Sequence, residues 1–292
     1  MPYSQPITQL VKARFSCRTY LERPLEHEVR QRLADFAASA ESGPLGTKAR
    51  FELVAASATD RQALKGLGTY GFIQGATGFI IGATKDAENG LEDFGFLMER
   101  IVLFATDLGL GTCWLGGSFT KSSFAAKIGV GNAELVPAVA AVGYSASHRS
   151  VVDRITRFVA SSHGRLPWEQ IFFDGDFGIP LLHETAGEYK VPLEMVRLGP
   201  SAYNRQPWRI LKRANAWHFY LQRPRGYRDR RASRLSWSVA DMQRLDMGIA
   251  MCHFELSAKE LGLEGRWVVA EPDIRTPGEL TLYTASWICG QA

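Results

Sequence analysis

Two short segments carry residue types that could hold a ligand. In the first, Ala13–Tyr20 (ARFSCRTY), side chains of an extended chain alternate between two faces, so Arg14, Ser16 and Arg18 share one face. Two guanidiniums beside a hydroxyl suit a phosphate, because the planar fork of arginine matches phosphate oxygens. An exposed basic edge with ordinary salt bridges explains the same residues, and the spacing alone leaves both interpretations open.

The second segment, Gly199–Trp208 (GPSAYNRQPW), predicts a stiff polar loop. Pro200 and Pro207 restrict φ and remove two backbone donors. The side chains that can form hydrogen bonds on this frame are Ser201, Asn204 and Gln206. Such a loop suits a planar ligand rich in polar groups. The alternative is a turn whose Asn and Gln side chains bond only their own backbone.

Three further features are weaker. The run GLGTYG (Gly66–Gly71) matches a dinucleotide-binding pattern, but an apolar strand follows it where that motif needs a helix, which favours a glycine-rich turn. His253 lies in a buried helical pattern, which favours packing over catalysis. The basic run Arg223–Arg234 favours a solvated loop, and the alternative is a lid or a contact for a phosphate group.

Composition indicates a globular chain of 292 residues, 46% of them hydrophobic and 22% charged. A net charge of +4 does not by itself indicate nucleic-acid binding, and we expect no such partner. The apolar runs are too short and too interrupted by glycine to span a membrane. The four cysteines form no Cys-x-x-Cys pattern, so we expect reduced thiols, a cytoplasmic location and no metal site.

Two long segments, Glu92–Gly117 and Leu245–Val269, resemble each other when one is shifted by 153 positions. At this shift Asp93 aligns with Asp246, Leu108 with Leu261 and Trp114 with Trp267. One gap-free register of this length predicts an internal duplication. We expect two halves, residues 1–157 and 158–292, joined by a linker within residues 148–168.

Each half is expected to mix helices and strands, which makes the fold class α+β. Helical patterns cover residues 25–40, 91–108, 179–198 and 241–261, and the second of these is apolar nearly all round. Strand patterns cover residues 50–56, 78–83, 138–144, 208–213, 217–223, 265–271 and 279–289.

The loop GPSAYNRQPW resembles the Pro-Ser-x-x-Asn-x-Gln-Pro-Trp signature of the nitroreductase family, whose members use flavin mononucleotide (FMN). RFSCRTY resembles the early Arg-x-Ser-x-Arg segment of that family, and LGLGTCWLGG (residues 108–117) resembles its later Gly-Gly segment. Together these matches extend from about Arg14 to Trp267. The order resembles a fused, duplicated branch known from a thermophile nitroreductase, because the loop comes late, in the second half.

The resemblance implies a nitroreductase-like fold whose two pseudo-symmetric halves imitate the family homodimer. In that homodimer, one subunit supplies the phosphate clamp and its partner supplies the Pro-Ser-x-x-Asn loop. Here the first half keeps only the clamp, with ESGPLGTKARF in place of the loop, and the second half keeps only the loop. Because these losses are complementary, we expect a monomer with a single FMN between its halves.

The family roles carry over to a set of cofactor-binding candidates. Arg14, Ser16, Arg18 and Arg149 are expected at the phosphate; Pro200, Ser201, Ala202 and Asn204 at the ring and ribityl chain; Leu115, Gly116 and Gly117 beside the ring; and Gly68, Thr69 and Tyr70 at a further contact. The implied reaction moves electrons from NAD(P)H through FMN to a small molecule such as a nitroaromatic or a quinone. The alternatives are a side-branch enzyme, for dehalogenation or oxygen-dependent flavin breakdown, and a non-catalytic flavin-binding protein.

Overall fold

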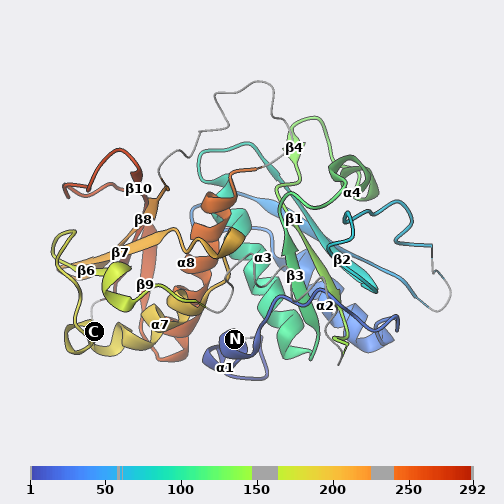
Figure 1. Ribbon diagram of the computed structural model, residues 1–292, viewed down its shortest axis with the longest axis horizontal. Coiled ribbons are helices and arrows are strands. Elements are labelled where there is room, and N and C mark those ends of the chain that lie inside the picture. Colours follow the sequence, from blue (N-terminus) through green and yellow to red (C-terminus); the bar gives the residue numbers. More distant parts are fainter. Residues whose placement is uncertain (1, 58–59, 61, 147–163, 225–239, 291–292) are drawn as a thin grey trace.

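Two β-sheets stand on either side of a pair of central helices in the computed structural model, which describes residues 2–57, 60, 62–146, 164–224 and 240–290 (Figure 1). The central helices are α3 (Gly90–Asp107) and α8 (Met242–Glu260). We call residues 2–146 the N-terminal part and residues 164–290 the C-terminal part. Each part contributes one sheet and one central helix.

The N-terminal sheet has the order β1-β2-β5-β3, with every neighbouring pair antiparallel and β4 paired to β2. Its strands are β1 (Ala49–Ala55), β2 (Gly78–Lys85), β3 (Gly111–Leu115), β4 (Glu134–Leu135) and β5 (Val139–Gly143). Besides α3, this part contains the helices α1 (Ile7–Ala13), α2 (His27–Ser39) and α4 (Lys121–Lys127).

The C-terminal sheet has the order β6-β7-β8-β10-β9, with β6 parallel to β7 and the other pairs antiparallel. Its strands are β6 (Phe172–Asp174), β7 (Trp208–Arg213), β8 (Ala216–Gln222), β9 (Gly265–Val268) and β10 (Thr281–Cys289). Besides α8, this part has the helices α6 (His183–Ala186) and α7 (Lys190–Leu198) and the short 3-10 helices Trp168–Gln170, Gly187–Tyr189 and Ala202–Asn204.

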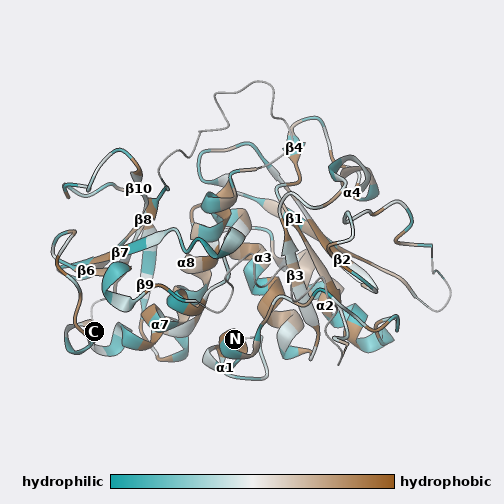
Figure 2. Cartoon of the chain, in the orientation of Figure 1, coloured by the Kyte–Doolittle hydropathy of each residue, from teal (hydrophilic) through white to brown (hydrophobic). Residues whose placement is uncertain are grey.

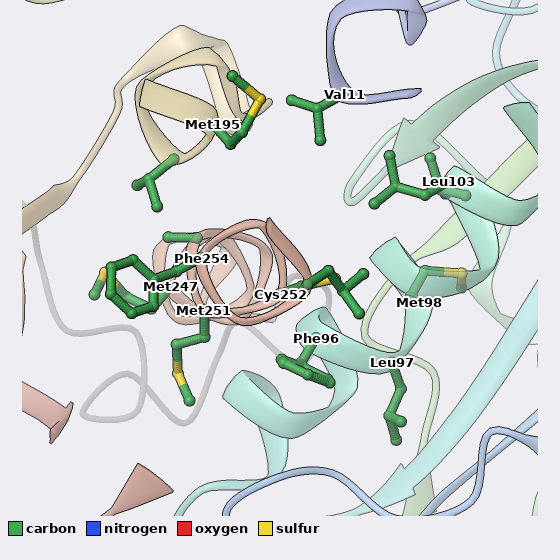
Figure 3. Packing of buried hydrophobic residues seen from close by; sticks show 14 of the residues in the cluster. Val11, Phe96, Leu97, Met98, Leu103, Met195, Met247, Met251, Cys252 and Phe254 are labelled. Atoms are coloured by element: carbon green, nitrogen blue, oxygen red, sulfur yellow. The ribbon is translucent and has the colours of Figure 1, made fainter. Parts of the chain in front are cut away.

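One large hydrophobic core joins the two parts, because the apolar faces of α3 and α8 pack on each other and on both sheets. Figure 2 shows the hydrophobic residues concentrated along the central helices and the strands. In Figure 3, Phe96 of α3 lies near Cys252 of α8, and Val11 of α1 lies close to Met195 of α7. The N-terminal helix α1 therefore packs against elements of the C-terminal part.

The central helices cross at two glycines. A Cβ on Gly95 would lie against the carbonyl oxygen of Leu245 and 3.0 Å from its carbonyl carbon. A Cβ on Gly248 would lie against the carbonyl oxygen of Glu92 and 2.6 Å from the amide nitrogen of Phe96. Glycine is needed at both positions because the two backbones touch there.

The sequence-based elements agree with the structure in most places. The patterns over 25–40, 91–108 and 241–261 correspond to α2, α3 and α8, and each predicted strand overlaps an observed one. The range 179–198 does hold a helix, α7, but this helix covers only its second half. The short helix α6 and a 3-10 turn precede α7, because Gly187 adopts a φ of 56°, outside the helical region. The sequence patterns missed α1, α4, β3, β4 and β6.

Two further expectations concern the ends and turns of these elements. GLGTYG forms a turn in which Gly66 and Gly71 have φ values of 84° and 78°, and β2 is the next element, so the turn interpretation is confirmed. The expected boundary between residues 157 and 158 lies outside the described residues. None of the described helices is long and apolar enough to cross a membrane.

Candidate functional site

The Arg-x-Ser-x-Arg segment leaves α1 in an extended conformation and runs beside β3. Ser16 forms a parallel bridge with Thr112, and the amide of Cys17 donates to the carbonyl oxygen of Thr112 at 2.8 Å. Cys17 is buried, whereas Arg14, Ser16 and Arg18 are each partly buried. Burial therefore does not alternate strictly along this segment, because Phe15 is 44% exposed although it was expected on the same face as Cys17.

Arg14 lies in an unusual environment for a cation. Its side chain is only 7% exposed, and its Nε lies 3.8 Å from Oε1 of Glu99. Within the described part of the chain, the Arg14 guanidinium makes no hydrogen bond, and its Nε is buried without a partner. Burial lowers the pKa of Arg14, although the nearby Glu99 partly offsets this. Arg14 is therefore not part of an ordinary surface salt bridge.

Glu99 belongs to a buried network that joins the two central helices. It accepts from the indole of Trp114 at 2.8 Å, and its other oxygen lies 2.9 Å from Nε2 of His253. Nδ1 of His253 lies 2.9 Å from the carbonyl oxygen of Met195, so it carries a proton to donate. One more proton must lie between His253 and Glu99, because two lone pairs would otherwise face each other. The pair is thus neutral as a unit.

The loop Gly199–Trp208 is held by a buried carboxylate and by its own serine. Ala202 N donates to Oδ1 of Asp246 at 3.0 Å, and Gln206 N donates to Oγ of Ser201 at 2.8 Å. Burial raises the pKa of Asp246 well above its usual value, and the bond from Ala202 partly offsets this.

The backbone of this loop is also strained. Tyr203, Asn204 and Gln206 have φ values of 51°, 53° and 48°. These values lie in the left-handed region, which costs residues other than glycine of order 1 kcal/mol each. Among the described residues outside glycine, only Tyr70 and Ala214 share this conformation. Strain of this kind concentrates at binding sites, which supports the loop as a functional element.

The polar side chains of the loop bind the neighbouring segment, residues 164–166. Nη1 of Arg165 donates to Oδ1 of Asn204 at 2.8 Å, and Nδ2 of Asn204 donates to the carbonyl oxygen of Gly164 at 2.8 Å. Leu166 N donates to Oε1 of Gln206 at 2.8 Å. The loop is therefore more than a turn that satisfies only its own backbone. The sequence analysis missed Arg165, because no motif or spacing pattern distinguishes this arginine from others in the chain.

The two glycine-containing candidate segments lie close to the extended segment of residues 14–18. The carbonyl oxygen of Gly68 accepts from Thr120 N at 3.0 Å, close to the chain that follows Gly117. In the same loop, Gln74 N donates to the carbonyl oxygen of Arg18 at 2.9 Å. Residues 68–70 and 115–117 therefore approach residues 14–18 on one side of the N-terminal sheet.

Within these segments the individual residues differ in exposure. Thr69 and Leu115 are buried, and Tyr70 is 69% exposed. Gly116 lies against the side chain of Met242, the first residue of α8, so a Cβ there would collide with that side chain. The C-terminal part thus touches the Gly-Gly segment directly.

The structure brings most of the candidates into one region at the junction of the two parts. The connection runs from Arg14 through Glu99 and His253 to the last turn of α7, which leads into the Pro200–Asn204 loop. Arg149 lies outside the described residues, as does the basic run beyond residue 224. Arg223 itself forms an ion pair with Asp241, the N-cap residue of α8, at 2.5 Å.

Comparison with known proteins identifies the fold as the α+β fold of nitroreductases. A family model with the description "Putative TM nitroreductase" matches residues 6–258. The chain therefore belongs to this nitroreductase family. None of the curated proteins compared matches the chain.

Among solved structures, the chain is similar to a putative nitroreductase from Thermotoga maritima, with a TM-score of 0.59 and 21% identity, over 99% of this chain and 95% of that one. A nitroreductase family protein from Clostridium difficile matches over 55% of this chain and 92% of its own, with a TM-score of 0.40 and 19% identity. A nitroreductase with bound FMN from Bacteroides fragilis matches over 51% and 92%, with a TM-score of 0.38 and 20% identity.

Proposed function

We propose that this chain is an oxidoreductase that binds one FMN at the junction of its two parts and passes electrons from NAD(P)H to a small acceptor such as a nitroaromatic or a quinone. The observation that carries the proposal is Arg14. Its buried guanidinium makes no hydrogen bond within the described residues, and both oxygens of the nearest carboxylate, Glu99, already face Trp114 and His253. Buried charges are normally paired, so this position fits an anionic ligand.

The donor set beside Arg14 suits the phosphate of a flavin nucleotide. Ser16 and Arg18 share its extended segment, and a serine hydroxyl between guanidiniums can donate to the same phosphate. The strained loop of the C-terminal part would close the site over the remainder of the ligand. The residues that we assign to the ring and ribityl chain are Gly68, Thr69, Tyr70, Leu115, Gly116, Gly117, Pro200, Ser201, Ala202 and Asn204.

When bound, FMN supplies a redox centre that accepts a hydride from NAD(P)H and releases electrons to an acceptor. The chain supplies binding and orientation. Asp246 fixes the amide of Ala202, and thereby the start of the loop. Because Glu99 and His253 share a proton, this pair adds no net charge to the site, and Arg14 remains charged beside it.

We also propose that the two parts form an intramolecular pseudo-dimer, so that the functional unit is a monomer. The sheets support this. When the short strands β4 and β6 are left aside, each sheet has four strands, and their order in space is first, second, fourth and third along the chain: β1-β2-β5-β3 and β7-β8-β10-β9. Gly95 and Gly248, which lie 153 positions apart, make reciprocal backbone contacts, as expected of a twofold interface. On β3 and β9, Trp114 and Trp267 each donate an indole N–H to a glutamate of a central helix.

The cellular location is part of the same proposal. None of the four cysteines, all of which lie in the described residues, forms a disulfide bond, and Cys17, Cys113 and Cys252 are buried. Cysteines kept as thiols are typical of a reducing compartment, so we place the enzyme in the cytoplasm.

The first experiment is to purify the protein, record its visible absorption and count the FMN released per chain. We expect a single FMN per chain that is bleached by NAD(P)H under anaerobic conditions. Arg14→Gln should weaken FMN binding by on the order of tenfold to a hundredfold, as expected for the loss of a charged hydrogen bond. Arg23→Gln, which removes an exposed arginine paired with Glu26, is the matched control and should bind FMN normally.

Three outcomes would contradict the proposal. No flavin after addition of FMN would reject the cofactor. Two FMN per chain would reject the single site. Equal binding by wild type and Arg14→Gln would reject the role of Arg14, and this variant should still fold, because Arg14 supports no hydrogen bond within the described chain.

A further inference from the structure

A second uncompensated cation lies near Arg14. Arg165 donates to the side-chain oxygen of Asn204 at 2.8 Å and to the carbonyl oxygen of Leu198 at 2.9 Å. Both acceptors are neutral, and no carboxylate in the described parts of the chain forms an ion pair with Arg165. By contrast Arg197, one residue before Leu198, is paired with Glu194 at 2.6 Å. The hydrogen bonds therefore orient Arg165 and leave its charge unmatched.

The last turn of α7 links the two arginines. On one side, Arg14 is 3.8 Å from Glu99, which contacts His253, and His253 contacts the carbonyl oxygen of Met195 at 2.9 Å. On the other side, Arg165 bonds the carbonyl oxygen of Leu198 in the same turn. Burial and then the charge of Arg14 lower the pKa of Arg165, which agrees with this proximity.

Arg14 and Arg165 together contribute two positive charges to the region, in addition to that of Arg18. Glu99 and His253 share one proton and are neutral together, so they compensate neither arginine. Arg14 and Arg165 then remain as two guanidiniums from opposite parts of the chain. A phosphate monoester carries about two negative charges at neutral pH and accepts paired hydrogen bonds from arginine. The charge of the region therefore matches a phosphate monoester better than a neutral ligand.

We propose that Arg165 is a further phosphate-binding arginine, contributed by the C-terminal part, and that Asn204 positions Arg165. This inference rests on the proposed FMN site and adds a residue to it. It makes the site selective for the phosphorylated flavin over riboflavin. The family resemblance implies that Asn204 contacts the ring and ribityl chain of the flavin. In this inference the side-chain amide of Asn204 instead orients Arg165.

The test compares the dissociation constants of FMN and riboflavin, measured by flavin fluorescence or calorimetry. We expect wild type to prefer FMN, and Arg165→Gln to lose on the order of tenfold to a hundredfold in FMN affinity with little change for riboflavin. Arg165→Lys keeps the charge and should recover part of the loss. Arg197→Gln is the matched control, since it removes a nearby arginine that already has a carboxylate partner.

Other outcomes separate this inference from the proposed function. If wild type binds FMN and Arg165→Gln binds it equally well, or loses both flavins equally, the inference fails and the FMN site stands. If Arg165→Gln does not fold, Arg165→Lys decides, because a selective loss of FMN supports the inference and an unchanged preference overturns it.

A chain that binds no flavin overturns the FMN site itself. Thermal stabilisation of wild type by inorganic phosphate would then test the anion site directly. Stabilisation that is reduced in Arg165→Lys would support a free phosphate as the occupant, and no stabilisation would reject the paired-arginine site.

Discussion

Replacing Gly248 by alanine should destabilise the fold, because the new methyl group has no room at the helix crossing. Its carbon would lie against the carbonyl oxygen of Glu92 and 2.6 Å from the amide nitrogen of Phe96. Both obstacles are backbone atoms of α3, so no side-chain rotation can relieve the contact. The helices α3 and α8 must move apart, and this would loosen the core that joins the two parts of the chain.

Two opposing terms set the size of the effect. Alanine is favoured over glycine in a helix by about 1 kcal/mol. Overpacking of a tight core costs about 1–3 kcal/mol, and a clash with rigid backbone falls at the upper end of that range. The net loss for Gly248→Ala is therefore about 2 kcal/mol, which corresponds to a fall in Tm of roughly 4–8 °C for a chain of this size.

Denaturant unfolding followed by circular dichroism measures this loss. The matched control is Gly131→Ala, because a Cβ at Gly131 meets only a carboxylate oxygen of Glu134, at 3.8 Å. This control should change stability by less than about 0.5 kcal/mol. Gly95→Ala should resemble Gly248→Ala, and the double variant should lose less than the sum, because one separation of the helices relieves both clashes. A neutral or stabilising Gly248→Ala would refute backbone contact at this crossing.

Two further variants test buried carboxylates. Burial raises the pKa of Asp93 from 3.8 to about 6, although Asp93 accepts hydrogen bonds from backbone amides. The folded protein therefore holds this proton more tightly than the unfolded chain. As pH rises from 4 to 6, the unfolding free energy of wild type should fall by about 2–3 kcal/mol relative to that of Asp93→Asn. A constant difference in unfolding free energy over this range would contradict that linkage. Glu99→Gln should cost about 3–5 kcal/mol, because it leaves the buried His253 without its carboxylate partner. The partly exposed Glu194→Gln should cost less than about 1 kcal/mol in the same unfolding measurement. Equal losses for the two would exclude a buried charge network at Glu99.

Local patterns were sufficient to predict much of the fold. The apolar helix over 91–108 and the strand WRILKR at 208–213 follow from periodicity and residue type, and both match the structure within one or two residues. The division of the range 179–198 into two helices also has a local cause. Gly187 takes a positive φ, which a hydrophobic pattern does not show.

The site was predicted less completely than the fold. Alternation predicts that Arg14, Ser16 and Arg18 share one side of an extended segment, and this stays a prediction. The prolines indicated a constrained loop, which agrees with its strained backbone. Neither pattern identified the acceptor of Arg165 or the carboxylate near Arg14. These partners lie 39 and 85 positions away in the sequence, beyond the range of any local signal.

The sequence by itself determined the element types, the stiff loop, the candidate clamp and the offset of 153 positions, because backbone propensity and side-chain periodicity act over a few neighbouring residues. Only the tertiary structure decided that Arg14 is buried with no hydrogen bond to any of the described residues, that Glu99 and His253 share a proton and that Asn204 orients Arg165. The first two of these facts depend on the packing of α3 against α8. That packing brings side chains of the two parts into a low-dielectric interior, where an unmatched charge becomes costly and so informative.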